Sequence, residues 1–403
     1  MSRSDLEITQ DVGGRKARCR GRGVGTLAIL LAMILTLAFA SGCGSSDDTS
    51  TAASTAEPAA ADEPAGDAVA AAEKKVAELS KTEGVKFPVP DKPFDPGHKR
   101  AAVIMAGQDE GFTAMVDSLK EAADTMGWTL GPPMDGKFNP AAQAGFIQQA
   151  VNEKYDAIIL LVIDAVNIES ALAAAKQANI PVACLMCENK GYEDEIIDVT
   201  TSGRPGGEAI ANYVTAASGG KAKVLLFDDK AYSIVKTRVE GFRDTLAQVC
   251  PECEIVDTVQ MTPASLAKPG PPEWLGALRR YSPDDFDWTV FPYDYYAIPA
   301  GKTALEQGRN VAITGYDGSP EMVRMIEKDG PVFKATVTAP FEYLPWAALD
   351  QVARASAGLE TWDTTQLPLR LVTPQNAAKF PKGWYVPHDF DPKAAFAPIW
   401  SGE

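Results

Sequence analysis

The chain has 403 residues, of which 45% are hydrophobic and 23% are charged, and its formal net charge is −16. This length exceeds what one hydrophobic core usually supports, so we expect two domains. The acidity excludes nucleic acid as a partner, because binding to phosphates requires clustered Lys and Arg side chains.

Residues 1–42 have the features of an export signal. Basic residues between Arg15 and Arg22 precede an apolar run, and the run ends in Ala40-Ser41-Gly42-Cys43. This order is typical of a secretory signal peptide, and the run of about seventeen residues is marginal for a membrane span. The alternatives are a plain signal peptide and a transmembrane anchor. Because small residues directly before a Cys resemble a bacterial lipobox, we expect Cys43 to be lipidated and to anchor the protein to the outer face of the cytoplasmic membrane.

Residues 43–97 are predicted to form an acidic, flexible tether. The stretch from 44 to 64 consists mainly of Ser, Thr, Ala, Asp, Glu and Pro, which cannot build a core. A short helix is expected at 68–79, and a Pro-rich segment at 85–96 leads into the folded part.

From residue 100 onward, short apolar strands alternate with helices. Strands are expected at 101–107, 157–163, 180–186, 223–229, 253–260, 288–294 and 311–318, and helices at 112–126, 140–152, 168–178, 206–217 and 235–249, with one ending at 307. The four prolines of residues 263–280 predict a loop that is followed by a helix at 273–280. This alternation predicts an α/β fold with doubly wound parallel sheets in two lobes. A ligand crevice is then expected at the carboxyl ends of the strands.

Residues for catalysis or metal binding do not cluster in the sequence. The two histidines, His98 and His388, stand near opposite ends of the predicted fold, so no Ser-His triad or His-rich metal site can be assembled. No glycine-rich dinucleotide motif follows a predicted strand, and no Walker A motif occurs. We therefore predict no enzyme, no catalytic residue, no cofactor and no metal site.

Six passages carry a resemblance to a known family. They are KEAADTMGWTL at 120–130, AAAKQANIPV at 173–182, Gly206-Gly207, Arg238-Val-Glu-Gly-Phe242, Gly315-Tyr-Asp-Gly318 and LRLVTPQN at 369–376. In this order they resemble the type I periplasmic sugar-binding proteins of ABC importers, the ribose-binding-protein group. The resemblance covers roughly 275 residues, from about Lys99 to Gln375, in keeping with the two-domain length.

The resemblance implies two doubly wound lobes joined by a three-stranded hinge, with crossings near 200, 338 and 361. The N-terminal lobe would comprise 98–200 plus 339–360, and the C-terminal lobe 201–338 plus 361–376. We expect residues 377–403 to pack on the lobes as a tail that could help to close the crevice. The implied protein is a monomer that binds a sugar-like solute and delivers it to an ABC permease. The alternative is a ligand-sensing receptor lipoprotein that feeds a membrane kinase.

The resemblance also assigns ligand-binding residues. Asp317 stands where the family has a carboxylate for ligand hydroxyls, and Arg238 where it has a donor. Phe112 matches a stacking aromatic, Asp109 occupies a polar position, and Tyr293 falls where the family often has Asn. From the residues alone, Asp317 could instead cap a helix, Arg238 could pair with an acidic side chain, and Phe112 could belong to the core. Two further residues that end strands, Asp164 and Asp228, could also face the crevice.

The departures from the family pattern concern the same crevice. Met186 and Cys187 stand where the family has an Asp-Arg pair, and we expect them to line the site. Ala339 replaces a Gln, and Gly111 replaces an aromatic residue. Because an unpaired buried polar group costs about 1–3 kcal/mol, this crevice predicts a ligand that is less hydroxylated, larger or partly apolar.

Two Cys-x-x-Cys pairs occur, at 184/187 and 250/253. A shared four-thiolate zinc site is excluded, because the first pair ends a strand of one lobe and the second follows a helix at the opposite end of the other lobe. In an oxidising location, Cys250 and Cys253 are expected to form a disulfide. A thioredoxin-like role does not fit a pair that follows a helix. Cys184 and Cys187 either form a disulfide or remain buried thiols.

Overall fold

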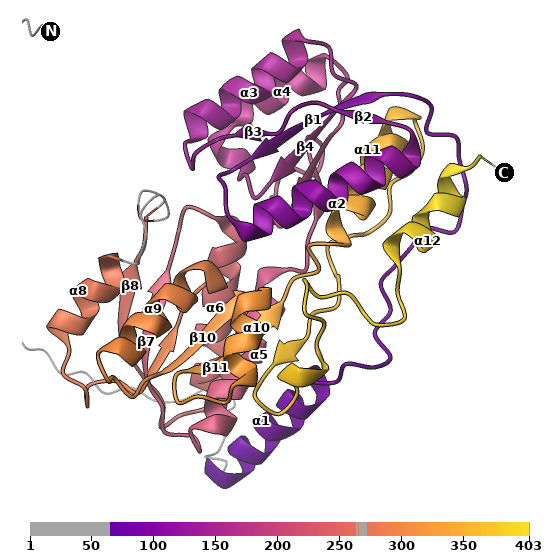
Figure 1. Ribbon diagram of the computed structural model, residues 1–403. Helices are drawn as coiled ribbons and strands as arrows, with labels where there is room; N and C mark the ends of the chain where they lie inside the picture. Colours follow the sequence, from indigo (N-terminus) through magenta and orange to yellow (C-terminus); the bar gives the residue numbers. More distant parts are fainter. Residues whose placement is uncertain (1–64, 263–264, 266–271, 403) are drawn as a thin grey trace, which may run out of the picture. The chain divides into compact units, whose positions relative to one another are not determined.

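The computed structural model describes residues 65–262, 265 and 272–402. The predicted signal peptide at 1–42, the lipidation site Cys43 and the first part of the tether lie outside these residues, as does most of the predicted loop at 263–271. The described chain begins with α1 (Ala65–Leu79), which packs against a helix of the second lobe, α5 (Gly203–Ala217) (Figure 1).

The first lobe is built on a six-stranded parallel sheet. Its strands are β1 (Arg100–Met105), β2 (Thr129–Leu130), β3 (Met134–Asp135), β4 (Ala157–Leu161), β5 (Val182–Leu185) and β6 (Ile197–Val199). The order is β2-β1-β4-β5-β6, and β3 also pairs with β1. Its helices are α2 (Glu110–Met126), α3 (Pro140–Asn152), α4 (Glu169–Gln177) and α11 (Leu344–Ser356) (Figure 1). All residues of β4 and β5 are buried, because helices cover both faces of a parallel sheet.

The second lobe repeats this plan. Its strands are β7 (Lys223–Asp228), β8 (Glu254–Gln260), β9 (Trp288–Val290), β10 (Ala312–Asp317), β11 (Phe333–Thr338) and β12 (Leu371–Val372). The order is β12-β11-β10-β9-β7-β8, and the pair of β11 with β12 is antiparallel. Its helices are α5, α6 (Ser233–Val249), α8 (Pro272–Arg280), α9 (Asp294–Glu306) and α10 (Pro320–Glu327). The predicted fold class, two parallel-sheet α/β lobes, is confirmed.

The chain passes between the two sheets three times. It enters the second lobe after β6, returns after β11 to α11, which packs on β4, β5 and β6, and comes back to the second sheet at β12. The crossing segments bond to one another: the N–H of Thr200 donates to the carbonyl of Thr364 at 2.9 Å, and that of Thr338 to the carbonyl of Arg370 at 2.8 Å. These hydrogen-bonded crossing segments form a compact hinge of the kind about which two lobes rotate.

Close packing of α5 on α6 fixes one wall of the second lobe. A Cβ on Gly207 would lie 2.0 Å from the carbonyl oxygen of Arg238, and one on Gly241 would lie 2.4 Å from that of Arg204. The two backbones therefore approach as only glycine allows. This contact sets the position of α6, which carries Arg238.

Several predicted strands are shorter than expected, and the segment 288–294 differs most. The segment 288–294 was predicted as strand, but β9 ends at Val290, Tyr293 is the residue before α9, and Asp294 begins that helix. Pro292 explains the early end, since proline has no N–H for a strand ladder. The shortened strand brings Tyr293 to the carboxyl edge of the sheet.

The C-terminal tail folds back on the first lobe. Its helix α12 (Pro392–Phe396) is followed by Trp400, whose ring stacks on Trp346 of α11 at 5.6 Å between centroids. The indole N–H of Trp400 donates to Asp350 of α11 at 2.8 Å, and Arg354 pairs with the same carboxylate at 2.7 Å. Buried aromatic stacking and a satisfied buried carboxylate hold the tail in place.

Candidate functional site

A cavity of about 470 Å³ lies at the carboxyl ends of the strands of both lobes, where parallel α/β sheets place their ligands. Its walls come from the start of α2, the end of β5, the start of α6, the loops after β9 and β10, the segment after β11 and the tail. The lining residues are Ala106, Asp109, Glu110, Gly111, Phe112, Met115, Phe138, Val162, Met186, Tyr232, Ile234, Val235, Arg238, Tyr293, Asp294, Tyr295, Tyr296, Ile298, Pro299, Lys302, Asp317, Ser319, Glu321, Phe341 and Trp384.

Arg238 and Asp317 form an ion pair in the second-lobe wall. One guanidinium nitrogen donates to Asp317 Oδ1 at 2.9 Å and the other to the carbonyl of Pro292 at 2.7 Å, and the two side chains are 7% and 18% exposed. Burial raises the pKa of Asp317, and the charge of Arg238 counteracts that rise. Both side chains still line the cavity, so the pair combines a donor and an acceptor at one place.

Asp317 sits in an unusual backbone conformation. Its φ is +96°, and Gly318 follows with φ +65°. A Cβ on Gly318 would lie 2.9 Å from Cα of Thr338, so glycine is required there. This turn at the end of β10 aims the carboxylate at the cavity, and such strained positions cluster at ligand sites.

Asp109 and Phe112 belong to the first turn of α2. Asp109 is the residue before the helix, and its carboxylate accepts from the N–H of Phe112 at 2.9 Å. Burial, together with the charge of Asp317 across the cavity, raises the pKa of Asp109 to about 6, while the hydrogen bond from Phe112 acts in the opposite direction. Phe112 is buried and meets Phe138 edge-on at 6.3 Å between ring centroids. The first lobe thus presents a carboxylate beside two aromatic rings.

Most other polar side chains of the lining already have partners. The hydroxyl of Tyr293 donates to Asp229 at 2.8 Å, and burial raises the pKa of Tyr293. The carboxylate of Asp294 accepts from the N–H of Ser319 at 2.7 Å and from the hydroxyl of Thr336 at 2.8 Å. Lys302 and Glu321, which also line the cavity, form an ion pair with each other at 2.6 Å.

Met186 lines the cavity, but Cys187 does not. Cys187 is 1% exposed and is joined to Cys184 by a disulfide, and Cys250 is likewise joined to Cys253. The structure thereby decides the alternative left open for the first pair. Within the described residues, no group of three or more His, Cys, Asp or Glu side chains is placed to hold a metal ion.

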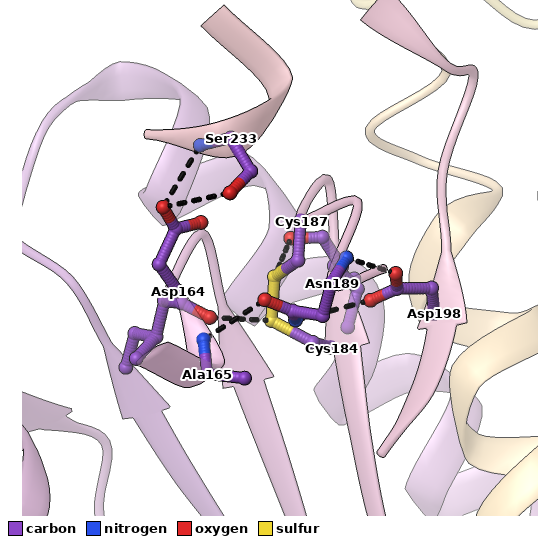
Figure 2. The surroundings of a disulfide bond; sticks show 9 residues. Asp164, Ala165, Cys184, Cys187, Asn189, Asp198 and Ser233 are labelled. Carbon is purple, nitrogen blue, oxygen red and sulfur yellow. Dashed lines mark hydrogen bonds between the residues drawn. A yellow bond between two sulfur atoms is a disulfide. The ribbon is translucent and has the colours of Figure 1, made fainter. Parts of the chain in front are cut away.

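The disulfide closes a tight loop at the end of β5 (Figure 2). Met186 and Glu188 both have positive φ, at +56° and +79°. Asn189 continues the loop: its side-chain oxygen accepts from the N–H of Ala165 at 2.8 Å, and its side-chain amide donates to Asp198 at 3.2 Å. The loop is therefore tied to the neighbouring strand ends of the first lobe.

Two carboxylates of the first lobe reach the second lobe. Asp164 accepts from the N–H and the hydroxyl of Ser233, at 2.8 Å and 3.1 Å (Figure 2). Glu188 accepts from the hydroxyl of Thr237 and, at 3.1 Å, from the N–H of Gly203. We call this set the interlobe contact. Because no side chain of its own lobe caps α6 at Tyr232, Asp164 supplies the cap from the opposite lobe.

The structure places some of the predicted site residues in the cavity lining and others elsewhere. Six of them line one cavity: Asp109, Phe112, Met186, Arg238, Tyr293 and Asp317. Asp164 instead bridges the lobes, and Asp228 accepts from Gln260 within the second lobe at 3.1 Å. Sequence reasoning did not single out Glu188 or the aromatic residues Phe138, Tyr232, Tyr295, Tyr296, Phe341 and Trp384. The aromatic composition of the tail was the one signal that could have pointed to Trp384.

Comparisons with known proteins agree with this architecture. A sequence profile described as a periplasmic binding protein domain matches residues 101–360. The chain therefore belongs to the periplasmic binding protein family, of type I. This is a family of solute-binding proteins rather than enzymes, so the prediction of a non-enzymatic protein is confirmed. Proteins of the family work outside the cytoplasm.

Three relatives illustrate the similarity. The ribose import binding protein RbsB of Escherichia coli (strain K12) is 24% identical over 267 residues, which cover 65% of this chain and 83% of that protein. An ABC transporter solute-binding protein from Bacillus halodurans C-125 with bound myo-inositol matches with a TM-score of 0.63 at 20% identity, covering 71% of this chain and 98% of that one. A sugar ABC transporter structure from Yersinia enterocolitica subsp. enterocolitica 8081 has a TM-score of 0.65 at 18% identity, covering 78% and 99%.

A search of the described helices for a membrane span finds none that is long and apolar enough to cross a bilayer.

Proposed function

We propose that the chain is the substrate-binding lipoprotein of an ABC importer and that it binds a sugar-like solute between its two lobes. One observation carries this proposal. Asp109 of the first lobe and the pair of Arg238 with Asp317 of the second line the same cavity, next to the ring of Phe112. Carboxylates and a guanidinium suit hydroxyls, which both donate and accept hydrogen bonds.

The arrangement explains how binding and closure are coupled. A solute between Asp109 and Asp317 contacts both lobes at once, so it stabilises the closed arrangement more than the open one. The closed form is the one that would present both lobes to the permease at a fixed spacing. The interlobe contact at Asp164 and Glu188 joins the two lobes through hydrogen bonds to Ser233 and Thr237, whereas burial of the Asp164 charge acts against closure.

The binding part of the proposal can be tested with the purified protein. Mass spectrometry of the denatured protein should reveal a co-purified hydroxylated solute, and a thermal-shift screen of sugars and polyols should identify stabilising ligands. Arg238→Ala and Asp317→Ala should each abolish the ligand-induced shift, because each removes a charged group that is assigned to bond to the solute; each should also lower the stability of the free protein, since the partner charge is left buried and unpaired. Arg204→Ala is the matched control, since Arg204 pairs with Asp244 at 2.9 Å on the surface of the same lobe. Full affinity in both pocket variants would refute the site.

The importer and anchor parts need separate tests. The ligand-loaded protein should stimulate ATP hydrolysis by a reconstituted ABC permease from the same organism, whereas stimulation of a membrane kinase alone would favour a sensor. Cys43→Ser should release the protein from the membrane fraction, and intact mass spectrometry of the wild type should show a diacylglyceryl addition at Cys43. An unmodified Cys43 would exclude the lipid anchor.

A further inference from the structure

The cavity has an aromatic pair that is built by two distant parts of the chain. The rings of Phe341, which follows β11, and Trp384, in the C-terminal tail, lie 4.4 Å apart between centroids at an angle of 32°. Both side chains line the cavity and are only 6% and 7% exposed. Trp384 stands beyond residues 101–360, the part of the chain that the family profile matches.

Several contacts hold this pair in position. The carboxylate of Glu342, beside Phe341, accepts a hydrogen bond from the backbone N–H of Trp384. The hydroxyl of Ser118 on α2 donates to the carbonyl of Glu342 at 2.7 Å. The tail is therefore fixed both to the crossing segment and, through that segment, to α2. Rings that are held in this way present a preorganised apolar surface, which lowers the entropy cost of binding.

The pair lies next to a polar group that can bind the ligand. A Cβ on Gly111 would lie 2.7 Å from the ring of Phe341 and 3.2 Å from Oδ1 of Asp109. The ring and the carboxylate therefore flank the same point at the start of α2. A ligand that fills this corner meets an acceptor on one side and an aromatic surface on the other.

The remaining lining also favours a ligand that is only partly polar. A second aromatic pair, Phe112 with Phe138, and the side chains of Met115, Val162 and Met186 belong to the first-lobe wall. On the opposite wall, the hydroxyl of Tyr293 and the carboxylate of Asp294 are already bonded within the protein. A ligand with hydroxyls on every side would leave some of them unpaired, and a buried unpaired polar group is costly.

We propose that the ligand is a glycoside with a planar apolar aglycone, and that Phe341 and Trp384 form the subsite for the aglycone. This inference rests on the proposed function, because the sugar ring is assigned to Asp109, Arg238 and Asp317. The cavity of about 470 Å³ lies within the range that takes such ligands, roughly 300–1,000 Å³. The tail thereby becomes a specificity element of the binding site.

The test compares matched ligands by calorimetry. The probes are 4-nitrophenyl and methyl glycosides of glucose, galactose, xylose and arabinose, with the free sugars alongside. The wild type should bind at least one nitrophenyl glycoside about tenfold tighter than its methyl counterpart, a typical gain for ring stacking with area burial. Trp384→Ala should reduce that preference to about twofold or less, because it lowers the affinity for the nitrophenyl glycoside more than that for the methyl glycoside.

Two further variants keep the result interpretable. Phe341→Leu should also remove the preference, and it serves if Trp384→Ala does not fold. Trp400→Phe is the control, because Trp400 belongs to the same tail but stacks on Trp346 outside the cavity; it should keep the preference.

The outcomes that overturn the inference are distinct from those that overturn the proposed function. Equal affinity for both glycoside series, binding of neither series, or a preference that survives both cavity variants overturns the aglycone subsite. Tight binding of a free sugar under these results leaves the proposed function standing. Absence of any solute, both in the panel and in the co-purified material, overturns the proposed function itself.

Discussion

We predict that Asp164 makes ligand binding depend on pH. In the structure, where the lobes are in contact at this residue, Asp164 is 7% exposed, and burial raises its pKa from 3.8 to about 6, while the hydrogen bonds from Ser233 act in the opposite direction. When the lobes separate, the carboxylate regains water and its ordinary pKa. A pKa difference of about 2 corresponds to about 3 kcal/mol between the two arrangements.

The direction of this pH dependence follows from the number of protons that Asp164 binds in the closed and open forms. Between about pH 4 and pH 6 the closed form binds more protons at Asp164 than the open form, so closure becomes more favourable as the pH falls through this window. At pH 7 the ionised carboxylate opposes closure. Since ligand binding is coupled to closure, this one group should strengthen affinity by up to about a hundredfold between pH 7 and pH 4.

Asp164→Asn isolates this effect. The amide is neutral at every pH and its oxygen can still accept from the N–H of Ser233, so the variant mimics the protonated carboxyl. We expect tighter binding than wild type at pH 7 and a flatter pH profile by calorimetry. Asp109, whose pKa is also raised to about 6, titrates in both proteins, so the difference between the profiles is the relevant quantity.

The control for this experiment is Asp228→Asn. Asp228 also ends a strand and is buried, but it accepts from Gln260 of its own lobe, so its substitution should leave the pH profile unchanged. If Asp164→Asn binds more weakly at pH 7 and keeps the full wild-type pH dependence, the reasoning is wrong.

Further expectations concern helix packing and the two disulfides. Gly207→Ala should lower the free energy of unfolding by about 3 kcal/mol in denaturant titration, since the new Cβ would lie 2.0 Å from a backbone oxygen. Gly145→Ala should raise it by about 0.5–1 kcal/mol, because the new Cβ would meet nothing within 4 Å in α3. Equal effects of both changes would contradict the packing argument. Replacing either disulfide by two serines should cost about 2 kcal/mol. Only Cys184→Ser with Cys187→Ser should speed hydrogen exchange in the first turn of α5, because the loop that this disulfide closes carries Glu188, which accepts from the N–H of Gly203. Faster exchange there in the Cys250 and Cys253 variant as well would count against the assignment.

Much of the fold could be predicted because local patterns determine it. Continuous apolar runs such as 157–163 indicate strands that are buried on both faces, and their alternation with helices indicates parallel sheets. The family resemblance of Gly315-Tyr-Asp-Gly318, rather than a local pattern, assigned Asp317 to the crevice. The structure places Asp317 in the cavity lining, and its role in binding stays a prediction. Strand β6, with three residues, is too short for a periodic signal.

The features that were missed depend on contacts between distant segments. No local pattern states that Trp384 meets Phe341 or that Glu188 caps elements of the other lobe. Cys187 was expected in the crevice because Met186 and Cys187 stand where the family has an Asp-Arg pair, but its sulfur is buried in the disulfide to Cys184. Gly111 was seen as a lost aromatic, whereas the ring of Phe341 occupies the space that a side chain there would need.

Asp109 and Asp317 lie on different lobes and line the same cavity, and their charges affect how readily the empty protein closes. The two carboxylates come from different lobes, and the charge of Asp317 raises the pKa of Asp109 across the cavity. In an empty cleft this repulsion opposes closure, although the ion pair of Asp317 with Arg238 reduces it. Under the proposed function, ligand hydroxyls would donate to both carboxylates and relieve the repulsion. Under the proposed function, the side chains that are assigned to the solute would also favour the open form of the unloaded protein, so a permease that recognises the closed form would seldom hydrolyse ATP for an empty binding protein.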